Sequence, residues 1–386
     1  MMSDAKPPYR LLAPGPVPVP PPVLKAMSDK VLHHRTPEFQ NILKKAWSGL
    51  KTVFATKQPV QILAGTGSAA MEAAVVNFLS PGDQVLVVDS GKFGERWAEI
   101  CEAYGIRTHR LKTPWGQPVN LAQFESTLKE HRAVKMVFSQ VCETSTATVH
   151  PIQKMAQIVA SHTSALFAVD AITAVGAMPL PMDEWNLDIV VGGSQKAFMI
   201  PTGLSFLAAS EKAWRQNASA RLPRFYLDLA AERKANEKGD TNFSSPTPLL
   251  VGLAMVVGRI QDVGLDLVIR RCANLAEATR SAAQALGLEL YSQAPSDSVT
   301  AIKTPNGVNS SDVRDWLERE RNITVMGGQN DLKGRILRIG HMGHILNGDM
   351  QAFFVALAEA LDRSKDVQRA QDVLSQKLKN EEILFP

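Results

Sequence analysis

Lys196 stands in a sequence context that suits an amine acting as a nucleophile. It lies in IVVGGSQKAF (189–198), where an apolar run ends at two glycines and Phe198 follows shortly after the lysine. An amine in apolar surroundings loses its proton more readily and can form a Schiff base with a carbonyl group. Most lysines are solvated, however, so Lys196 by itself predicts no activity.

Two further stretches place an anion-binding turn and an acid at the ends of expected strands. GTGSAA (65–70) lies between an apolar run and a helical pattern, where glycine backbone and helix N–H groups can bind phosphate. The same letters match the G-x-G-x-x-A pattern of dinucleotide-binding folds, and Asp89 closes the next strand where a ribose-binding acid would lie. Asp170 ends the run ALFAVD, a position for a ligand-binding acid or for a helix N-cap.

A phosphate-binding turn, a strand-end acid and a desolvated lysine are together what pyridoxal phosphate needs from a protein. The lysine forms the Schiff base, and the acid keeps the pyridine nitrogen protonated so that the ring withdraws electrons. Gly192 and Gly193 are expected to turn the chain so that Lys196 reaches the cofactor. The dinucleotide alternative explains only GTGSAA and Asp89, and it leaves Lys196 and Asp170 without roles.

The elements that must position these residues alternate between strands and helices from residue 60 onward. Continuous β-branched runs separated by helical patterns predict a mostly parallel sheet covered by helices on both faces. The expected strands are 60–65, 84–89, 134–141, 165–170 and 187–193, and the expected helices are 68–80, 93–105 and 151–162. The candidate residues would then lie at the carboxyl edge of one sheet.

The chain divides into three expected parts. Eight prolines between positions 7 and 22 exclude a helix or a central strand, so residues 1–22 are interpreted as an arm on the body or on a partner subunit. Residues 23–262 would form a large α/β domain. Residues 263–386 combine helical patterns with short apolar strands, which predicts a smaller C-terminal α+β domain.

The composition is that of a globular protein without a nucleic-acid footprint. The 386 residues are 45% hydrophobic and 21% charged, with a net charge of +4 and scattered basic residues. No apolar run is long enough to span a membrane, and a cytoplasmic location is expected. The cysteines form no paired motif and the histidines lack a third ligand, so no disulfide framework, iron–sulfur cluster or other metal site is expected. The cysteines are Cys101, Cys142 and Cys272.

Seven motifs, in order along the chain, resemble those of class V, fold-type I aminotransferases, closest to the serine–pyruvate and alanine–glyoxylate branch. They are PGPVPVP (14–20), GTGSAAMEA (65–73), SGKFGERW (90–97), ETSTA (143–147), AVDAITAVGA (168–177), GGSQKAF (192–198) and LRIGHMG (337–343). The resemblance implies an α/β large domain with a mostly parallel, seven-stranded sheet sandwiched by helices, and a smaller C-terminal domain. It also implies pyridoxal 5′-phosphate as the cofactor.

The resemblance assigns roles to single residues. Lys196 would form the Schiff base, and Asp170 would pair with the pyridinium nitrogen. Arg338 would hold the substrate carboxylate through a bidentate pair, and Gly15 is also implied at the substrate site. The other cofactor-binding residues implied are Thr66, Gly67, Ser68, Phe93, Ser145, Ile172, Gln195 and Ser244.

The activity that the resemblance implies is transamination between a small α-amino acid of the serine or alanine type and a small 2-oxo acid such as glyoxylate or pyruvate. The protein would be a homodimer with shared active sites, and the arm would cross to the partner. Relatives often supply a tyrosine and a threonine to the partner's phosphate, whereas this chain has TNFSS (241–245), so either Ser244 or Ser245 would serve. No nucleic-acid or membrane partner is expected.

Two alternatives remain open from the sequence. Another class V chemistry, such as a cysteine desulfurase or another lyase, would need a nucleophilic cysteine on a mobile loop, whereas Cys272 lies in an expected helix. An NAD-linked oxidoreductase would use the GTGSAA turn together with Asp89.

Overall fold

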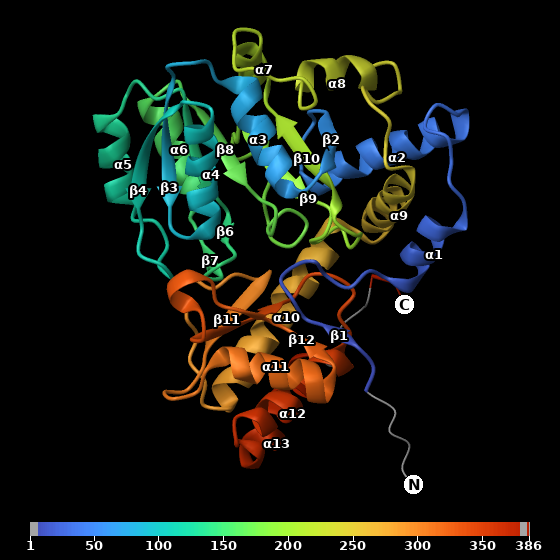
Figure 1. Cartoon of the computed structure of the whole chain (residues 1–386), viewed down its shortest axis with the longest axis vertical. Helices are drawn as coiled ribbons and strands as arrows, with labels where there is room; N and C mark the ends of the chain where they lie inside the picture. Colours follow the sequence, from blue (N-terminus) through green and yellow to red (C-terminus); the bar gives the residue numbers. More distant parts are fainter. Residues whose placement is uncertain (1–6, 379–383, 386) are drawn as a thin grey trace.

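A seven-stranded sheet forms the centre of the molecule (Figure 1). The computed structural model describes residues 7–378 and 384–385, and the sheet order is β2-β10-β9-β8-β5-β3-β4. All neighbours pair in parallel except the two pairs made by β10. The expected mostly parallel, seven-stranded sheet is therefore confirmed. The strands are β2 (Val60–Gly65), β3 (Gln84–Asp89), β4 (Arg107–Lys112), β5 (Met136–Gln140), β8 (Leu166–Asp170), β9 (Ile189–Gly193) and β10 (Gly203–Ala209).

The strand pattern of the sequence missed β4 and β10. The letters of β4, RTHRLK, are mostly charged or polar, and this strand lies at the edge of the sheet, where such side chains reach solvent. β10 is apolar but runs antiparallel, because only residues 194–202 connect it to β9. Parallel pairing needs a crossover of a dozen residues or more, so this short connection forces the chain to reverse.

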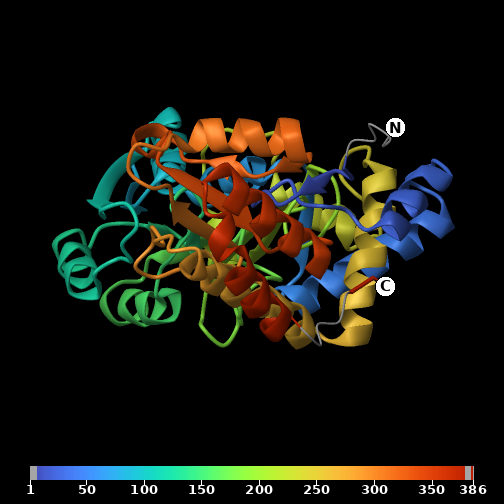
Figure 2. The ribbon, with the colours of Figure 1, turned by 90° about the horizontal axis from the view of Figure 1, so that it is seen from below.

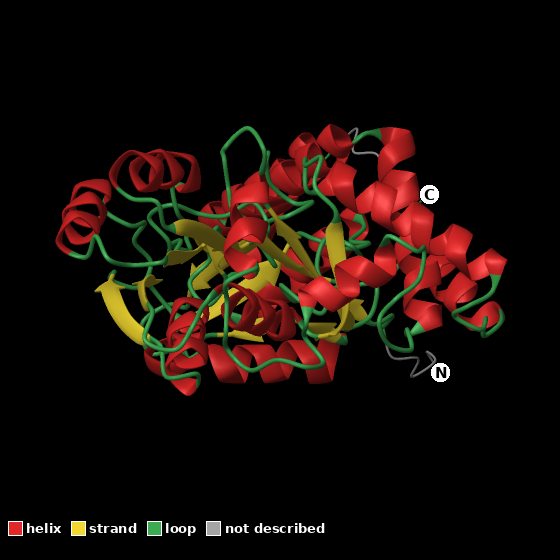
Figure 3. Ribbon diagram, turned by 90° about the horizontal axis from the view of Figure 1, so that it is seen from above, coloured by secondary structure: helices red, strands yellow, loops and turns green. Residues whose placement is uncertain are grey.

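Helices cover both faces of the sheet, as seen from above in Figure 3. Side chains alternate along each strand, so in β3 Val85 and Val87 face one helix layer while Leu86 and Val88 face the other. One layer contains α3 (Gly67–Phe78), α4 (Lys92–Ala103), α7 (Glu211–Asn217) and α8 (Leu229–Asn236). The other contains α2 (Pro37–Val53), α5 (Leu121–Glu130), α6 (Ile152–His162) and α9 (Thr247–Val263).

The C-terminal elements form a smaller unit below the large sheet in Figure 1. Its antiparallel sheet has the order β11-β14-β13 and packs with the last four helices. We propose a domain boundary where α9 and α10 meet at an angle of 93°. The elements are β11 (Val299–Lys303), β12 (Ile323–Thr324), β13 (Met326–Gly327), β14 (Ile336–Gly340), α10 (Leu265–Ala285), α11 (Ser310–Arg321), α12 (Asn347–Ala360) and α13 (Val367–Lys377).

None of the described helices is by itself long and apolar enough to cross a membrane. The bent pair of α9 and α10 passes such a test together, by length and composition alone. The cytoplasmic location expected from the sequence stays a prediction.

The N-terminal arm, followed by α1 (Pro21–Asp29), packs against the C-terminal unit of its own chain (Figure 2). β1 (Arg10–Leu11) pairs in parallel with β12, and the carbonyl of Leu12 accepts a hydrogen bond from Gly340 N at 2.7 Å. Leu12 and Val17 are buried there. The apolar side chains of the described part of the arm are therefore covered by the same chain, and the expected crossing of the arm to a partner stays a prediction.

Candidate active site

Lys196 lies just beyond the carboxyl end of β9, in a turn formed by residues 194–198. Its side chain is 9% exposed, and Nζ donates a hydrogen bond to the carbonyl oxygen of Pro14 at 2.7 Å. The pKa of Lys196 is lowered to about 8, mainly by burial and also by the charge of Arg338, while Asp170 acts in the opposite direction. The side chain is thus an amine that loses its proton close to neutral pH, which is the nucleophilic form.

Gly192 and Gly193 do not form this turn, so that expectation from the sequence is wrong. They are the last two residues of β9 and pair with β10. Space is tight at both positions: a Cβ on Gly192 would lie 3.1 Å from the Phe54 ring, and one on Gly193 would lie 3.3 Å from Cγ2 of Ile172. The two glycines therefore let neighbouring segments approach the strand, and the turn itself starts at Ser194.

The N-terminal arm crosses directly over the lysine at Gly15. A Cβ on Gly15 would lie 2.1 Å from Nζ of Lys196, and the residue has a φ of +133°, which side chains rarely adopt. Glycine is therefore required here both for space and for conformation. The contact of Lys196 with Pro14 was not foreseen from the sequence, because a backbone carbonyl carries no signal in the residue type.

Asp170 ends β8, the strand beside β9, and aligns with Val191. Its side chain is buried, its Oδ1 accepts a hydrogen bond from Ile172 N at 2.8 Å, and burial raises its pKa to about 7. The helix N-cap alternative is wrong, because residues 172–177 fold as turns and no helix follows Asp170. No ion pair holds Asp170 within the described chain, and a buried acid in this position suits a polar ligand at its other oxygen.

The predicted phosphate-binding turn lies at the start of α3. Thr66 is the N-cap residue, yet its hydroxyl makes no hydrogen bond to the helix, and the first helical N–H groups have no helical acceptor. A Cβ on Gly67 would lie 2.5 Å from Cδ1 of Ile172, so only glycine fits where the turn meets the segment after β8. The side-chain oxygen of Gln195 is buried and has no hydrogen-bond partner among the described residues. Free helix N–H groups suit a ligand with several acceptor oxygens, such as a phosphate, whereas the unpaired amide oxygen of Gln195 needs a donor.

Phe93 and Ser145 lie at the first turn of α4, on the same edge of the sheet. The hydroxyl of Ser145 accepts a hydrogen bond from Lys92 N at 3.2 Å and donates to Oε1 of Glu143 at 2.5 Å. Glu143 is fully buried and also accepts a bond from Phe93 N at 3.1 Å. Glu143 is the first residue of the ETSTA motif, and the sequence alone predicts no role for it.

Arg96 is a second residue to which the sequence analysis assigned no role. Its guanidinium lies 4.9 Å from the centroid of the Phe93 ring, and Nη1 donates to Oγ of Ser68 at 3.2 Å. The two contacts join α4 to the phosphate-binding turn and leave a positive charge beside it. A usable signal was the i, i+3 spacing of Phe93 and Arg96 on one helix.

Arg338 lies in β14 of the C-terminal unit and faces the segment that contains Ser145. Its Nε donates to the carbonyl of Gly327 at 2.9 Å, and its Nη1 donates to the carbonyl of Thr144 at 3.0 Å. Burial lowers the pKa of Arg338 to about 10, so its positive charge persists at neutral pH. The two carbonyls orient the guanidinium, and Nη2 makes no hydrogen bond to the described residues. That nitrogen can bind a carboxylate.

The loop 241–245 is not joined to these residues within one chain. Ser244 is exposed, whereas the hydroxyl of Ser245 is hydrogen-bonded to the hydroxyl of Thr241 at 2.7 Å. The loop instead lines a hollow beside α9 together with Tyr226 and Phe243. The assignment of Ser244 to the cofactor phosphate stays a prediction.

The dinucleotide alternative lacks a free acid to bind the ribose. Asp89 is buried at the end of β3, where Nζ of Lys112 lies 2.5 Å and Nη1 of Arg110 3.5 Å from its carboxylate. The carboxylate thus joins β3 to the edge strand β4, and it is not free to accept hydrogen bonds from a ribose. What remains of that alternative is the glycine turn alone.

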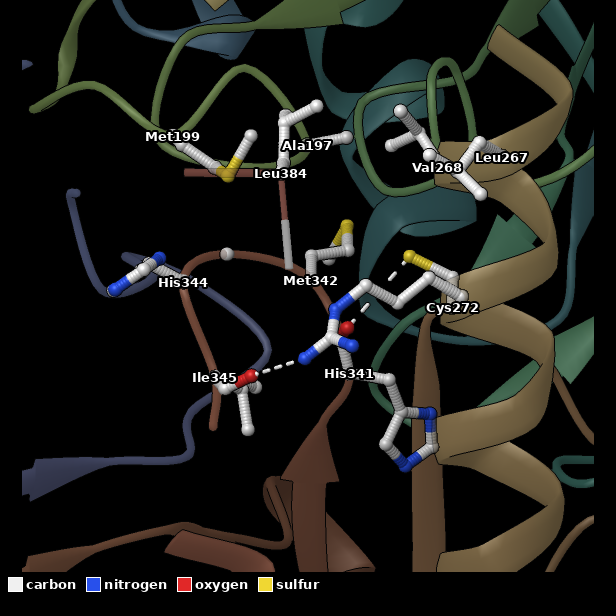
Figure 4. Close-up of a pocket in the computed structure, with 12 residues that line it drawn as sticks. Ala197, Met199, Leu267, Val268, Cys272, His341, Met342, His344, Ile345 and Leu384 are labelled. Atoms are coloured by element: carbon white, nitrogen blue, oxygen red, sulfur yellow. Dashed lines mark hydrogen bonds between the residues drawn. The ribbon is translucent and has the colours of Figure 1, made fainter. Parts of the chain in front are cut away.

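The desulfurase alternative lacks a suitable cysteine. Cys272 lies inside α10 at a cavity beside the lysine turn, and its Sγ donates to the carbonyl of His341 at 3.6 Å (Figure 4). Burial raises the pKa of this thiol to about 12. A helical, protonated and buried thiol is a poor nucleophile. Within residues 7–378 and 384–385, no three side chains of His, Cys, Asp or Glu are arranged to hold a metal ion.

Comparison with known proteins agrees with the residues that this site brings together. A sequence model of the family described as Aminotransferase class-V matches residues 11–337. The chain is 42% identical over 355 residues to a protein of Synechococcus sp. named "Soluble hydrogenase, small subunit", covering 91% of this chain and 92% of that one. It is 33% identical over 357 residues to the L-aspartate–glyoxylate aminotransferase of Paracoccus denitrificans, covering 90% of each.

A solved structure agrees with the fold as well. The ureidoglycine–glyoxylate aminotransferase of Bacillus subtilis superposes with a TM-score of 0.89 at 28% identity, covering 98% of this chain and 100% of that one. The hydrogenase name of the Synechococcus relative assigns no site in this chain, whereas the lysine, the acid and the phosphate-binding turn suit one cofactor. The chain belongs to the class V aminotransferases, with their fold-type I architecture and pyridoxal phosphate as the cofactor.

Proposed function

We propose that the protein transfers an amino group from a small α-amino acid of the serine or alanine type to a small 2-oxo acid, glyoxylate or pyruvate. The names of the Paracoccus and Bacillus relatives share glyoxylate and differ in the amino donor. The shared part of these names supports glyoxylate as acceptor. The choice of a small donor rests on the sequence motifs of the serine–pyruvate and alanine–glyoxylate branch.

The environment of the Lys196 amine carries this proposal. Pyridoxal phosphate, when bound, attaches the substrate nitrogen and withdraws electrons from the substrate Cα. Lys196 would take the proton from the substrate Cα on Nζ and return it to the carbon on the other side of the substrate nitrogen, a transfer that suits an amine with a pKa of about 8. The Pro14 carbonyl holds the free amine in place between these steps, and Asp170 keeps the ring nitrogen protonated.

Arg338 selects a substrate with a carboxylate. Its guanidinium is buried, charged and oriented by the carbonyls of Gly327 and Thr144, with Nη2 left for the substrate. A planar guanidinium binds a carboxylate in one orientation, which aligns the substrate Cα for the proton transfer. Both the amino acid and the 2-oxo acid carry this carboxylate, so one arginine serves both half-reactions.

A rapid-mixing screen of the cofactor-loaded protein tests the proposal. Serine or alanine alone should change the visible absorption of the cofactor, and glyoxylate or pyruvate should then restore it, as a ping-pong reaction requires. Borohydride should attach the cofactor to Lys196, and Lys196→Ala serves as the control that cannot be labelled. A spectrum that no amino acid changes would refute transamination, whereas a response to aspartate alone would refute only the small donor.

We also propose a homodimer in which loop 241–245 of one subunit completes the phosphate site of the other. Phe225 and Tyr226 are 81% and 49% exposed beside this loop, and such a patch suits a subunit interface. Thr66 is exposed in the single chain, which leaves room for a partner subunit beside the phosphate-binding turn.

Light scattering and two serine variants test the dimer. Ser244→Ala should weaken cofactor binding, whereas Ser245→Ala should not, because the Ser245 hydroxyl is already paired with Thr241. If Ser245→Ala weakens cofactor binding and Ser244→Ala does not, Ser245 is the residue that reaches the partner's phosphate site. A mass of one chain at micromolar concentration would refute the dimer.

A further inference from the structure

The carboxylate of Glu143 is completely buried and surrounded by hydrogen-bond donors. Its Oε2 accepts from Phe93 N and Gly94 N, each at 3.1 Å, and from the side-chain amide of Gln140 at 3.2 Å. Its Oε1 accepts from Ser145 N at 3.2 Å and from the Ser145 hydroxyl at 2.5 Å. No other acidic side chain in the described part of the chain accepts this many hydrogen bonds in a fully buried position.

The pattern of donors favours the ionised form of Glu143. Backbone N–H groups and a side-chain amide N–H can only donate, and the Ser145 hydroxyl already accepts from Lys92 N at 3.2 Å. A protonated carboxyl would have only the Ser145 hydroxyl, which keeps one lone pair, as an acceptor for its O–H. Burial raises the pKa of Glu143, and these hydrogen bonds oppose that rise.

Glu143 takes the place of the missing N-cap of α4. The N-cap residue is Gly91, which has no side chain to accept from the first turn of the helix. A Cβ on Gly91 would lie 2.6 Å from the Glu143 carboxyl carbon and 2.5 Å from the Ser145 hydroxyl. Glycine therefore makes room for a carboxylate that comes from β6 (Cys142–Glu143) and not from the helix itself. An anion at a helix N-terminus is also favoured by the helix dipole.

We propose that Glu143 is a positioning residue. It holds Phe93 and Ser145 in place against the cofactor ring without contacting the ring itself. One carboxylate binds the backbone of Phe93 and both the backbone and hydroxyl of Ser145, so the two move as one unit. The inference rests on the proposed contacts of Phe93 and Ser145 with the cofactor. It adds a residue that does not itself touch the cofactor but sets the distance between the two that do.

The charge of Glu143 acts on the site as well. The negative charge of Glu143 raises the pKa of Arg338, which favours its charged form, and it also raises the pKa of Asp170. Neutralising Glu143 should therefore make Asp170 more acidic and alter the pH at which the bound cofactor changes its absorption. A purely structural acid would not have this effect.

The test compares Glu143→Gln with Asp188→Asn in the cofactor-loaded protein. Asp188 is also buried, and its carboxylate accepts hydrogen bonds from Phe167 N at 3.0 Å and from Ser210 Oγ at 2.8 Å. It precedes β9, however, and so lies at the amino ends of the strands, away from the proposed cofactor site. Glu143→Gln should raise the dissociation constant of pyridoxal phosphate at least tenfold and change the visible circular dichroism of the bound cofactor. Asp188→Asn should lower the melting temperature and leave both cofactor measurements unchanged.

Two further variants keep the test decisive if Glu143→Gln does not fold. Glu143→Asp should recover part of the cofactor affinity because it keeps the charge, and Gly91→Ala should lose affinity because its methyl group displaces the carboxylate. Unchanged affinity and circular dichroism in Gly91→Ala, or in Glu143→Gln, would overturn the inference. If the wild-type protein itself does not bind pyridoxal phosphate, the proposed function fails instead, so the two failures are distinguishable.

Discussion

Replacing Lys196 with methionine should stabilise the cofactor-free protein at neutral pH, although it removes the residue on which the proposed activity depends. Methionine fills a similar volume without a charge. Burial lowers the pKa of Lys196 from 10.5 to about 8, and each pH unit between these values is worth about 1.4 kcal/mol. The folded wild-type protein therefore loses about 3 kcal/mol of stability below pH 8. The lost hydrogen bond to Pro14 offsets about 1 kcal/mol, which leaves a net gain of about 2 kcal/mol.

The pH dependence separates this effect from ordinary packing. Between pH 8 and pH 10.5 the unfolded chain binds a proton that the folded chain does not bind, so wild-type stability rises with pH in this window. The methionine variant lacks this dependence. Its advantage should therefore shrink as the pH rises above 8 and become a deficit of about 1 kcal/mol by pH 10.5, because the hydrogen bond to Pro14 is still lost.

Urea unfolding followed by circular dichroism measures the difference at pH 7 and at pH 10. The matched control is Lys135→Met, which removes an exposed lysine and should not change the pH dependence. If Lys196→Met is less stable than the wild type by the same amount at both pH values, the buried, easily deprotonated amine is refuted.

Three other predictions concern the residues around this lysine. Arg338→Lys should raise the KM of both substrates at least tenfold and leave the cofactor spectrum unchanged, because an ammonium group cannot bind both carbonyls and the substrate carboxylate in the planar geometry of a guanidinium; an unchanged KM would place the carboxylate elsewhere. Gly15→Ala should abolish Schiff-base formation, since its Cβ would lie 2.1 Å from Nζ of Lys196, whereas Gly82→Ala, with nothing within 4 Å, should keep full cofactor absorption. Deleting residues 1–20 should lower the melting temperature by several degrees independently of protein concentration, because the arm packs on its own chain; a loss of dimer mass with an unchanged melting temperature would contradict that packing.

Local sequence patterns were sufficient where a single periodicity decided the structure. The expected strands 84–89 and 165–170 match β3 and β8 to within one residue, because continuous apolar runs bounded by turns have few other folded solutions. β10 was missed although it is apolar, because its pairing depends on the short connection from β9. The edge strand β4 was missed because its charged letters resemble a loop.

What the sequence determined by itself is the chemistry that this protein can carry. Its ordered motifs contain the residues for this chemistry, and membership of the class follows from them: Lys196, Asp170, the GTGSAA turn and Arg338. Only the tertiary structure decided how these groups are held. The Pro14 carbonyl accepts a hydrogen bond from Lys196, the Glu143 carboxylate in β6 caps the helix α4, and the arm packs on its own chain. Such contacts join backbone groups and buried charges that are far apart in sequence, and no local pattern encodes which of them will meet.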